Sequence, residues 1–150
     1  MKTNRLILPL LLLAAVCGLA PTVRAAERAR VQGILISASN ERGQTDRRLA
    51  SFEPTLRRIL RFESYRFVGE DSAVVGVREQ GQLSLGDGHV LEIETEHSDG
   101  RGIHVRVRWL GNGRTLMNTG LVLRPGVPAV LGGPSSGHHN EVYAVILVGS

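Results

Sequence analysis

The chain has 150 residues, of which 42% are hydrophobic, and it carries a formal net charge of +4. This size and composition are typical of one globular domain, and they exclude a bundle of membrane helices and a disordered chain. Three of the 18 basic residues, Lys2, Arg5 and Arg24, precede Ala25, which leaves 15 arginines against 14 acidic residues. Because this balance is close to neutral, we predict no nucleic-acid partner.

The N-terminus has the pattern of a secretory signal peptide. A short basic stretch, 1–5, precedes an apolar run, 6–20, and Val23 and Ala25 stand at the −3 and −1 positions of a cleavage site. We predict cleavage after Ala25, which leaves 26–150 as one exported domain in the periplasm or at the outer membrane. A retained anchor is the alternative, but 15 apolar residues in a helix span only about 22 Å of a bilayer core of ~30 Å.

The single cysteine, Cys17, lies inside this segment. Lipidation at Cys17 would need a small residue directly before it, and Val16 stands there, so we favour cleavage after Ala25. The mature chain then has no disulfide, no thiolate nucleophile and no cysteine-ligated metal. A domain of about 125 residues has a core large enough to fold without disulfides.

A strand and a helix are predicted to open the mature domain. Residues 30–39 are β-branched and apolar, as in a strand, and 40–44 form a polar break. Thr45 or Asp46 can cap the helix that follows, and Pro54 predicts a kink or a fresh helix start because it lacks an amide hydrogen. The helix is expected to bury one apolar stripe: Leu49, Phe52, Leu56, Ile59 and Leu60.

Short strands with period-two alternation are predicted from residue 65 onward. Residues 65–69, 72–78 and 82–85 are separated by turns that contain glycine, and 86–88 is a hairpin turn. Asn112-Gly113 marks a second tight turn.

The pattern is strongest in the hairpin formed by 89–97 and 103–109. If the turn is centred on Gly100, acidic residues oppose basic ones or histidine on one face: Glu96 with His104, Glu94 with Arg106, Glu92 with Arg108. The other face is largely apolar: Thr95 with Val105, Ile93 with Val107, Leu91 with Trp109. In this register, His97 and His104 point to opposite faces of the sheet.

The remaining strands complete the predicted fold. Residues 115–123 and 129–131 have strand character, and 142–148 are apolar on both sides, as in a central or closing strand. We predict a mainly β (α+β) fold: an antiparallel β-sandwich or partly closed barrel of eight or nine strands, with one helix that covers an end or face and that Pro54 kinks or restarts.

A serine motif appears late in the chain. Gly133–Gly137 matches G-x-S-x-G with Ser135 in the nucleophile position. That chemistry needs a helix after the serine and a later acid followed by histidine, whereas here a strand follows and His138 precedes Glu141. We therefore interpret this segment as a flexible loop, predict no catalytic residue and expect no enzyme; a hydrolase that uses Ser135 is the least favoured hypothesis.

No cofactor or metal site is predicted. Neighbouring residues in extended chain, such as His138 and His139, point to opposite sides and do not readily share an ion. His97 and His104 are opposed in the predicted register, and zinc needs three or four converging ligands.

The densest charge lies on the predicted helix, at Arg47, Arg57, Arg58 and Arg61. These side chains either form a solvated helix face, partly balanced by Glu53 and Glu63, or bind an acidic partner, phosphate or polysaccharide. The candidate binding residues are these four arginines with three residues of the loop 132–141, namely Ser135, His138 and His139.

Two resemblances add to these observations. Residues 121–133, followed by 142–148, resemble a strand–turn–strand pattern with a Gly-Gly ending found in outer-membrane secretins, which are far longer proteins. The mature chain, including the Leu56–Leu60 helix and 62–66, also resembles small uncharacterised exported proteins of Gram-negative bacteria. These resemblances imply an exported β-rich domain, and they imply no activity and no site residues.

Together these features predict a non-enzymatic envelope protein that acts through protein–protein contacts, as an accessory of an envelope assembly. The alternative is a binding module for an anionic cell-surface ligand, a glycan or a lipid head group. Neither hypothesis involves a membrane-spanning segment after processing.

Overall fold

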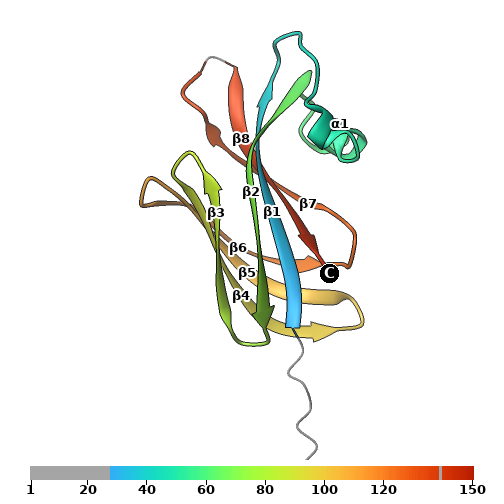
Figure 1. Cartoon of the computed structure of the whole chain (residues 1–150), viewed down its shortest axis with the longest axis vertical. Helices are drawn as coiled ribbons and strands as arrows, with labels where there is room; N and C mark the ends of the chain where they lie inside the picture. The colour runs from blue at the N-terminus through green and yellow to red at the C-terminus, as the bar shows by residue number, and fades with distance from the viewer. Residues whose placement is uncertain (1–27, 139) are drawn as a thin grey trace, which may run out of the picture.

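The computed structural model describes residues 28–138 and 140–150 (Figure 1). The predicted signal peptide, its cleavage site and His139 lie outside the described residues. The strands are β1 (Arg28–Ser39), β2 (Ser64–Gly76), β3 (Gln80–Gly86), β4 (His89–Asp99), β5 (Gly102–Gly111), β6 (Arg114–Leu123), β7 (Ala129–Ser135) and β8 (Glu141–Gly149). A short 3-10 helix, η1 (Arg47–Leu49), and an α-helix, α1 (Glu53–Ile59), lie between β1 and β2.

The strands form two antiparallel sheets packed face to face. Sheet A has the order β2-β1-β8-β7, and sheet B has the order β3-β4-β5-β6. The predicted mainly β sandwich is confirmed, and the barrel alternative is wrong because the two sheets do not close on each other. Strand β8 lies between β1 and β7, which confirms the central position predicted from its two apolar sides.

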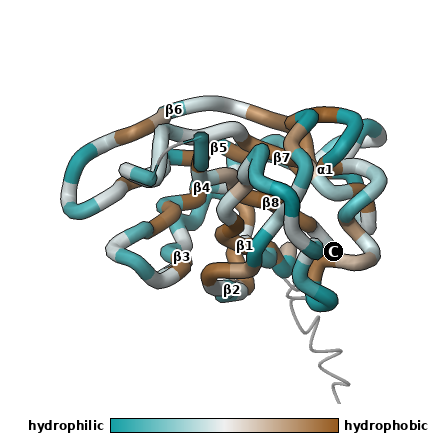
Figure 2. The backbone as a smooth tube through the Cα atoms, turned by 90° about the horizontal axis from the view of Figure 1, so that it is seen from above, coloured by the Kyte–Doolittle hydropathy of each residue, from teal (hydrophilic) through white to brown (hydrophobic). Residues whose placement is uncertain are grey.

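The main core lies between the sheets. It is built from inward-facing residues of both sheets, including Leu35 and Val145 of sheet A and Leu91, Val107 and Trp109 of sheet B. Each of these side chains is at most 1% exposed. Hydrophilic residues gather in the outer loops and hairpin turns (Figure 2), as expected when alternate strand residues turn inward.

A second core lies on the outer face of sheet A. There Ile36 and Ile146 of the sheet pack with Leu49 of η1 and Leu56 of α1, and all four are fully buried. Tyr65 ties the two layers together, because its hydroxyl donates to the Leu56 carbonyl at 3.1 Å. The helical segment is therefore a third layer held on the sandwich.

The predicted helix divides into two pieces. Asp46 caps η1 by accepting a hydrogen bond from the Arg48 amide at 3.0 Å, and Pro54 lies in the first turn of α1. The cap and the fresh helix start are thus confirmed. The predicted apolar stripe is wrong at Ile59, which is 48% exposed. The prediction of that stripe assumed one continuous helix. The break before α1 rotates the residues after it relative to those before it.

Strand β2 is longer than the sequence predicts. The segment 65–69 and residues 72–76 of the segment 72–78 belong to one strand, in which Glu70 and Asp71 pair with Ile34 and Gly33 of β1, whereas Val77 and Arg78 lie in the turn that follows. Charged residues are tolerated here because β2 is an edge strand of sheet A.

The predicted register of β4 and β5 is confirmed for the five pairs from Leu91–Trp109 to Thr95–Val105. A β-bulge then follows, and His97 rather than Glu96 lies opposite His104. Unbroken alternation would turn His97 inward on the side of Thr95, and the bulge avoids this because a buried polar ring without a partner is unfavourable.

The Trp109 ring imposes a further constraint, at Gly133 of β7. A Cβ atom on Gly133 would lie 2.5 Å from Cζ3 of Trp109 and 2.9 Å from the Tyr143 carbonyl oxygen. The glycine that begins the G-x-S-x-G match is therefore needed for packing.

We expect Gly133→Ala to lower the free energy of unfolding by about 2 kcal/mol, because the added methyl group overpacks a rigid ring and backbone. Urea unfolding measures the change. Gly100→Ala is the matched control, since nothing lies within 4 Å of a Cβ atom there. Equal stability of the two variants would contradict this account of Gly133.

Candidate functional site

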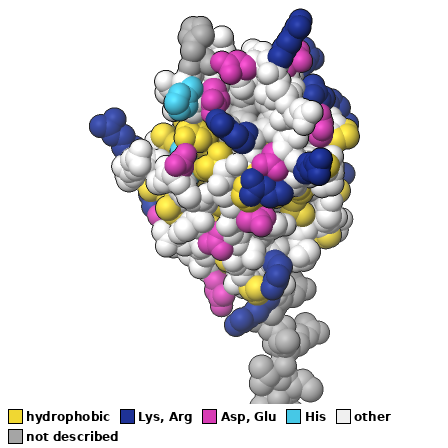
Figure 3. Space-filling view, turned by 45° about the horizontal axis from the view of Figure 1, so that its top comes forward, with side chains coloured by type: hydrophobic (Ala, Val, Ile, Leu, Met, Phe, Trp, Pro, Cys, Tyr) yellow, Lys and Arg dark blue, Asp and Glu magenta, His cyan; other side chains and the backbone are white. Residues whose placement is uncertain are grey.

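Positive charge is concentrated on residues 41–66, which we call the basic segment. This segment comprises η1, α1 and their flanks, and it carries seven arginines against four acidic residues, a formal net charge of +3. The predicted mature chain carries a net charge of +1, so the rest of it is slightly acidic. In Figure 3, basic side chains gather at the upper right of the molecule, on the side where α1 lies.

Arg48 is engaged within the fold. Its guanidinium donates to the Asp46 carboxylate at 2.8 Å and lies 4.1 Å from the centre of the Phe67 ring. The hydrogen bonds from the Arg48 side chain and amide lower the pKa of Asp46 to about 2. This arginine thus stabilises the start of η1.

Arg57, one of the predicted binding residues, is also engaged. Its Nε donates to the Glu53 carboxylate at 2.9 Å, one helical turn away, and its Nη2 donates to the Glu63 carbonyl at 3.0 Å. These contacts tie α1 to the chain that enters β2. Arg57 therefore has a structural role in addition to its charge.

The other three predicted arginines, Arg47, Arg58 and Arg61, behave differently. All three are exposed, and they form no hydrogen bond or ion pair through their side chains with any residue that the structure describes. We call them the open arginines. They lie on the helical layer that the second core fixes to sheet A.

A hollow of about 340 Å³ lies beside the basic segment, at one end of sheet A. Its charged lining residues are Glu41, Arg42, Asp46, Arg66 and Glu141. Acidic groups outnumber basic ones there, and the Arg66 guanidinium already donates to Glu141 at 3.3 Å. This hollow, which the sequence did not predict, is therefore unsuited to an anion.

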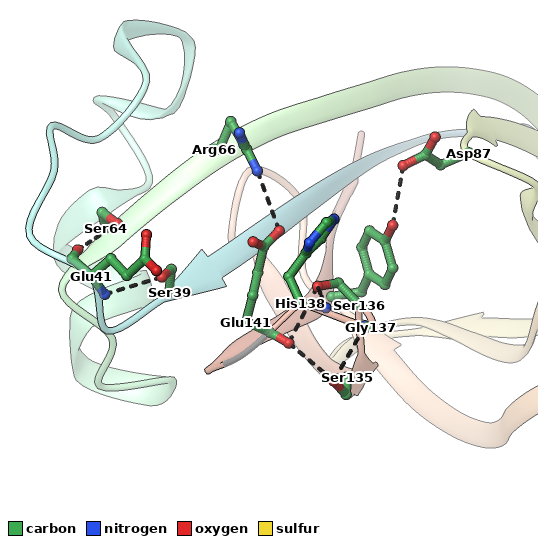
Figure 4. A network of polar contacts seen from close by, with 11 residues as sticks. Ser39, Glu41, Ser64, Arg66, Asp87, Ser135, Ser136, Gly137, His138 and Glu141 are labelled. Carbon is green, nitrogen blue, oxygen red and sulfur yellow. Dashed lines mark hydrogen bonds and ion pairs between the residues drawn. The ribbon is translucent and has the colours of Figure 1, made fainter.

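The Ser135 hydroxyl takes part in hydrogen bonds within the β7–β8 hairpin. Ser135 ends β7, which extends beyond the predicted 129–131 and removes part of the predicted flexible loop. Its hydroxyl donates to the Glu141 carbonyl at 3.4 Å and accepts from the Gly137 amide at 3.3 Å (Figure 4). A turn and then β8 follow instead of a helix, so these contacts close the end of the β7–β8 hairpin.

His138 lies in the same hairpin end. It is exposed, and its amide donates to the Ser136 hydroxyl at 3.3 Å (Figure 4). The structure keeps Ser135 and His138 in one hairpin turn and places the four predicted arginines on the separate helical layer. The predicted binding residues thus form two groups.

Two histidines that were predicted to face opposite ways are brought together. The β-bulge places His97 directly opposite His104, with ring centres 4.0 Å apart and planes inclined by 17°. The Asp99 carboxylate lies 2.8 Å from Nε2 of His104 and 3.8 Å from Nε2 of His97. The sequence-based prediction is wrong here because it assumed alternation without a bulge.

A buried polar group, His89, was also missed. Its Nδ1 accepts a hydrogen bond from the Trp109 indole at 2.9 Å, and its ring lies 4.4 Å from that of Tyr143. The Tyr143 hydroxyl donates to Asp87 at 3.1 Å. Burial lowers the pKa of His89, and the nearby Asp87 opposes this more weakly. The alternation of 89–95 was a usable signal, since it places His89 on the inner face with Leu91.

Comparison with known proteins gave no match to a protein-family model, to a curated protein or to a solved structure. Within the described residues, no helix has the length and apolar character needed to cross a membrane. The resemblances to secretins and to small exported proteins stay predictions.

The lowered pKa of His89 predicts a loss of stability in acid. The unfolded chain, with a histidine pKa near 6.5, takes up this proton before the folded protein does. The His89 contribution to stability is therefore full above that pH and falls as the pH drops through 6.5 toward the folded pKa. Thermal midpoints measured between about pH 7.5 and 5.5 test this.

His89→Gln retains an acceptor for the Trp109 indole without a titrating ring, so its midpoint should fall less over the same range. His138→Gln, which alters an exposed histidine, serves as the control and should follow the unaltered protein. Identical pH profiles for all three proteins would rule out His89 as the source.

Proposed function

We propose that this chain is a non-enzymatic envelope protein that docks onto an acidic surface of a protein partner through the open arginines Arg47, Arg58 and Arg61. The observation that carries the proposal is their exposure without an internal acidic partner among the described residues. Arginine is enriched at protein interfaces, where its planar guanidinium binds carboxylates in bidentate fashion.

The helical layer supports this role because it is held in place before any partner binds. Leu49 and Leu56 are fully buried, and the Tyr65 hydroxyl bonds to α1. A backbone that is already fixed reduces the loss of conformational entropy on binding.

The surface favours a protein over a small anion. Ile59, which is 48% exposed, lies between Arg58 and Arg61 in sequence and adds an apolar group to a charged surface. Such a combination suits a protein interface, in which an apolar centre is surrounded by polar groups. The adjoining hollow is lined by three acidic residues and two arginines, a balance that disfavours phosphate or sulfate.

The envelope location rests on the predicted signal peptide, and the partner is therefore sought in that compartment. A glycan or a lipid head group is the alternative ligand, since it too would be attracted by the open arginines. Ile59 separates these two hypotheses, because its apolar side chain adds to a protein interface and little to the binding of a sugar or a head group.

The experiment is capture of envelope proteins by the tagged chain in its own host, followed by mass spectrometry. Replacing Arg47, Arg58 and Arg61 together with Glu should reduce recovery of the specific partner by about tenfold or more, since about 1.4 kcal/mol of lost binding gives that factor. The thermal midpoint should change little, because none of the three side chains makes an ion pair with a described residue.

The matched control replaces three other exposed arginines, Arg30, Arg114 and Arg124, with Glu and produces the same change in net charge. This control should retain the partner. Equal loss in both triple variants would show a general charge effect and contradict docking by the helical layer. Ile59→Ser should weaken the binding of a protein partner, whereas unchanged binding would favour the anionic ligand.

A further inference from the structure

We propose that His97, Asp99 and His104 form a binding site for a divalent transition-metal ion at the end of the β4–β5 hairpin, with zinc as the representative ion. This site is separate from the helical layer and does not depend on the proposed docking function.

Three ligand atoms converge at the end of this hairpin. One nitrogen of each imidazole and one carboxylate oxygen all lie within 4.8 Å of one another. Two ligands on one tetrahedral zinc ion, at about 2.1 Å each, are about 3.4 Å apart. The distances from Asp99 Oδ2, 2.8 Å to His104 Nε2 and 3.8 Å to His97 Nε2, lie on either side of that value. The spacing of these atoms is therefore compatible with one shared ion.

The backbone holds these residues in place. The bulge at Glu96 brings His97 onto the face of His104, and antiparallel pairing keeps the two rings opposite each other. The Arg101 amide donates to Asp99 Oδ1 at 2.8 Å, which orients the carboxylate with Oδ2 toward the imidazoles. A hydrogen bond of this kind, behind a ligand, is common at metal sites.

The ligand types indicate the class of ion. Imidazole nitrogens suit zinc, copper and nickel, whereas calcium and magnesium require mostly oxygen ligands. The side chains of His97 and Asp99 are 56% and 42% exposed, so an ion can enter without opening the fold. Three protein ligands leave a coordination position for water or for a donor from another molecule.

Binding of the ion would also displace a proton. The hydrogen bond between His104 and Asp99 places one proton between two of the ligand atoms. The ion replaces that proton, which moves to the other ring nitrogen of His104 or to solvent.

The test is calorimetric titration of the chelator-treated full chain, without a histidine tag, with zinc chloride. We expect one ion per chain and a rise in thermal midpoint with zinc concentration. His97→Gln, Asp99→Asn and His104→Gln should each weaken binding by about tenfold or more, since loss of an outer-shell contact alone typically weakens binding by 10–100-fold.

The control variants are Glu96→Gln, which removes a neighbouring exposed carboxylate, and His138→Gln, which removes an exposed histidine elsewhere. Both should bind zinc as the unaltered chain does. No zinc binding by the unaltered chain, or binding by the His97→Gln and His104→Gln variants as strong as that of the unaltered chain, would overturn the proposal and leave the Asp99–His104 contact as a hairpin hydrogen bond. Bound cobalt gives a second readout, because its visible absorption should disappear in the three ligand variants alone.

Discussion

The burial of both faces of β1 and β8 is the constraint on which the rest of the structure depends. Their inward residues, such as Leu35 and Val145, fill the core between the sheets, whereas Ile36 and Ile146 face the other way. A sheet that is apolar on both faces needs two covers, and sheet B provides only one. The segment between β1 and β2 supplies the second cover with Leu49 and Leu56, and in doing so it fixes η1 and α1 on the outside of the molecule.

Sheet B and the helical layer differ in how their arginines are paired. On β5 of sheet B, cross-strand carboxylates pair with them: Arg106 donates to Glu96 at 3.2 Å, and Arg108 donates to Glu92. Arg114 at the edge of sheet B forms no ion pair with a described residue. On the helical layer, only some of the arginines are paired, and Arg57 serves to hold α1 in place. The gathering of three exposed arginines, Arg47, Arg58 and Arg61, on one fixed layer distinguishes the helical layer as a candidate docking surface. Exposed charges that pair within one sheet contribute little to binding elsewhere, because their partners compete with any ligand.

Much of the architecture could be predicted because period-two alternation and turn chemistry are local properties. Positive φ angles at Asp87 and Asn112, of 53° and 48°, occur where the sequence predicts tight turns. The missed features depend on contacts between distant residues. The bulge at Glu96, the exposure of Ile59 and the neighbours of Gly133 follow from how strands and layers meet, which no single segment encodes. The same distinction holds for the candidate sites. The exposure of the four predicted arginines could be predicted from the helical period. The hydrogen bond from Arg57 to the Glu63 carbonyl and the approach of His97 to His104 could not, because they depend on the fold.

In-cell photo-crosslinking can test whether the helical layer contacts a protein partner in the envelope. A photoreactive residue at position 58 reports contacts of α1, and the same residue at position 114, also exposed, reports those of the sheet B edge. Our account predicts a discrete adduct of one partner from position 58 and none from position 114. No adduct from position 58, or the same adducts from both positions, would contradict it.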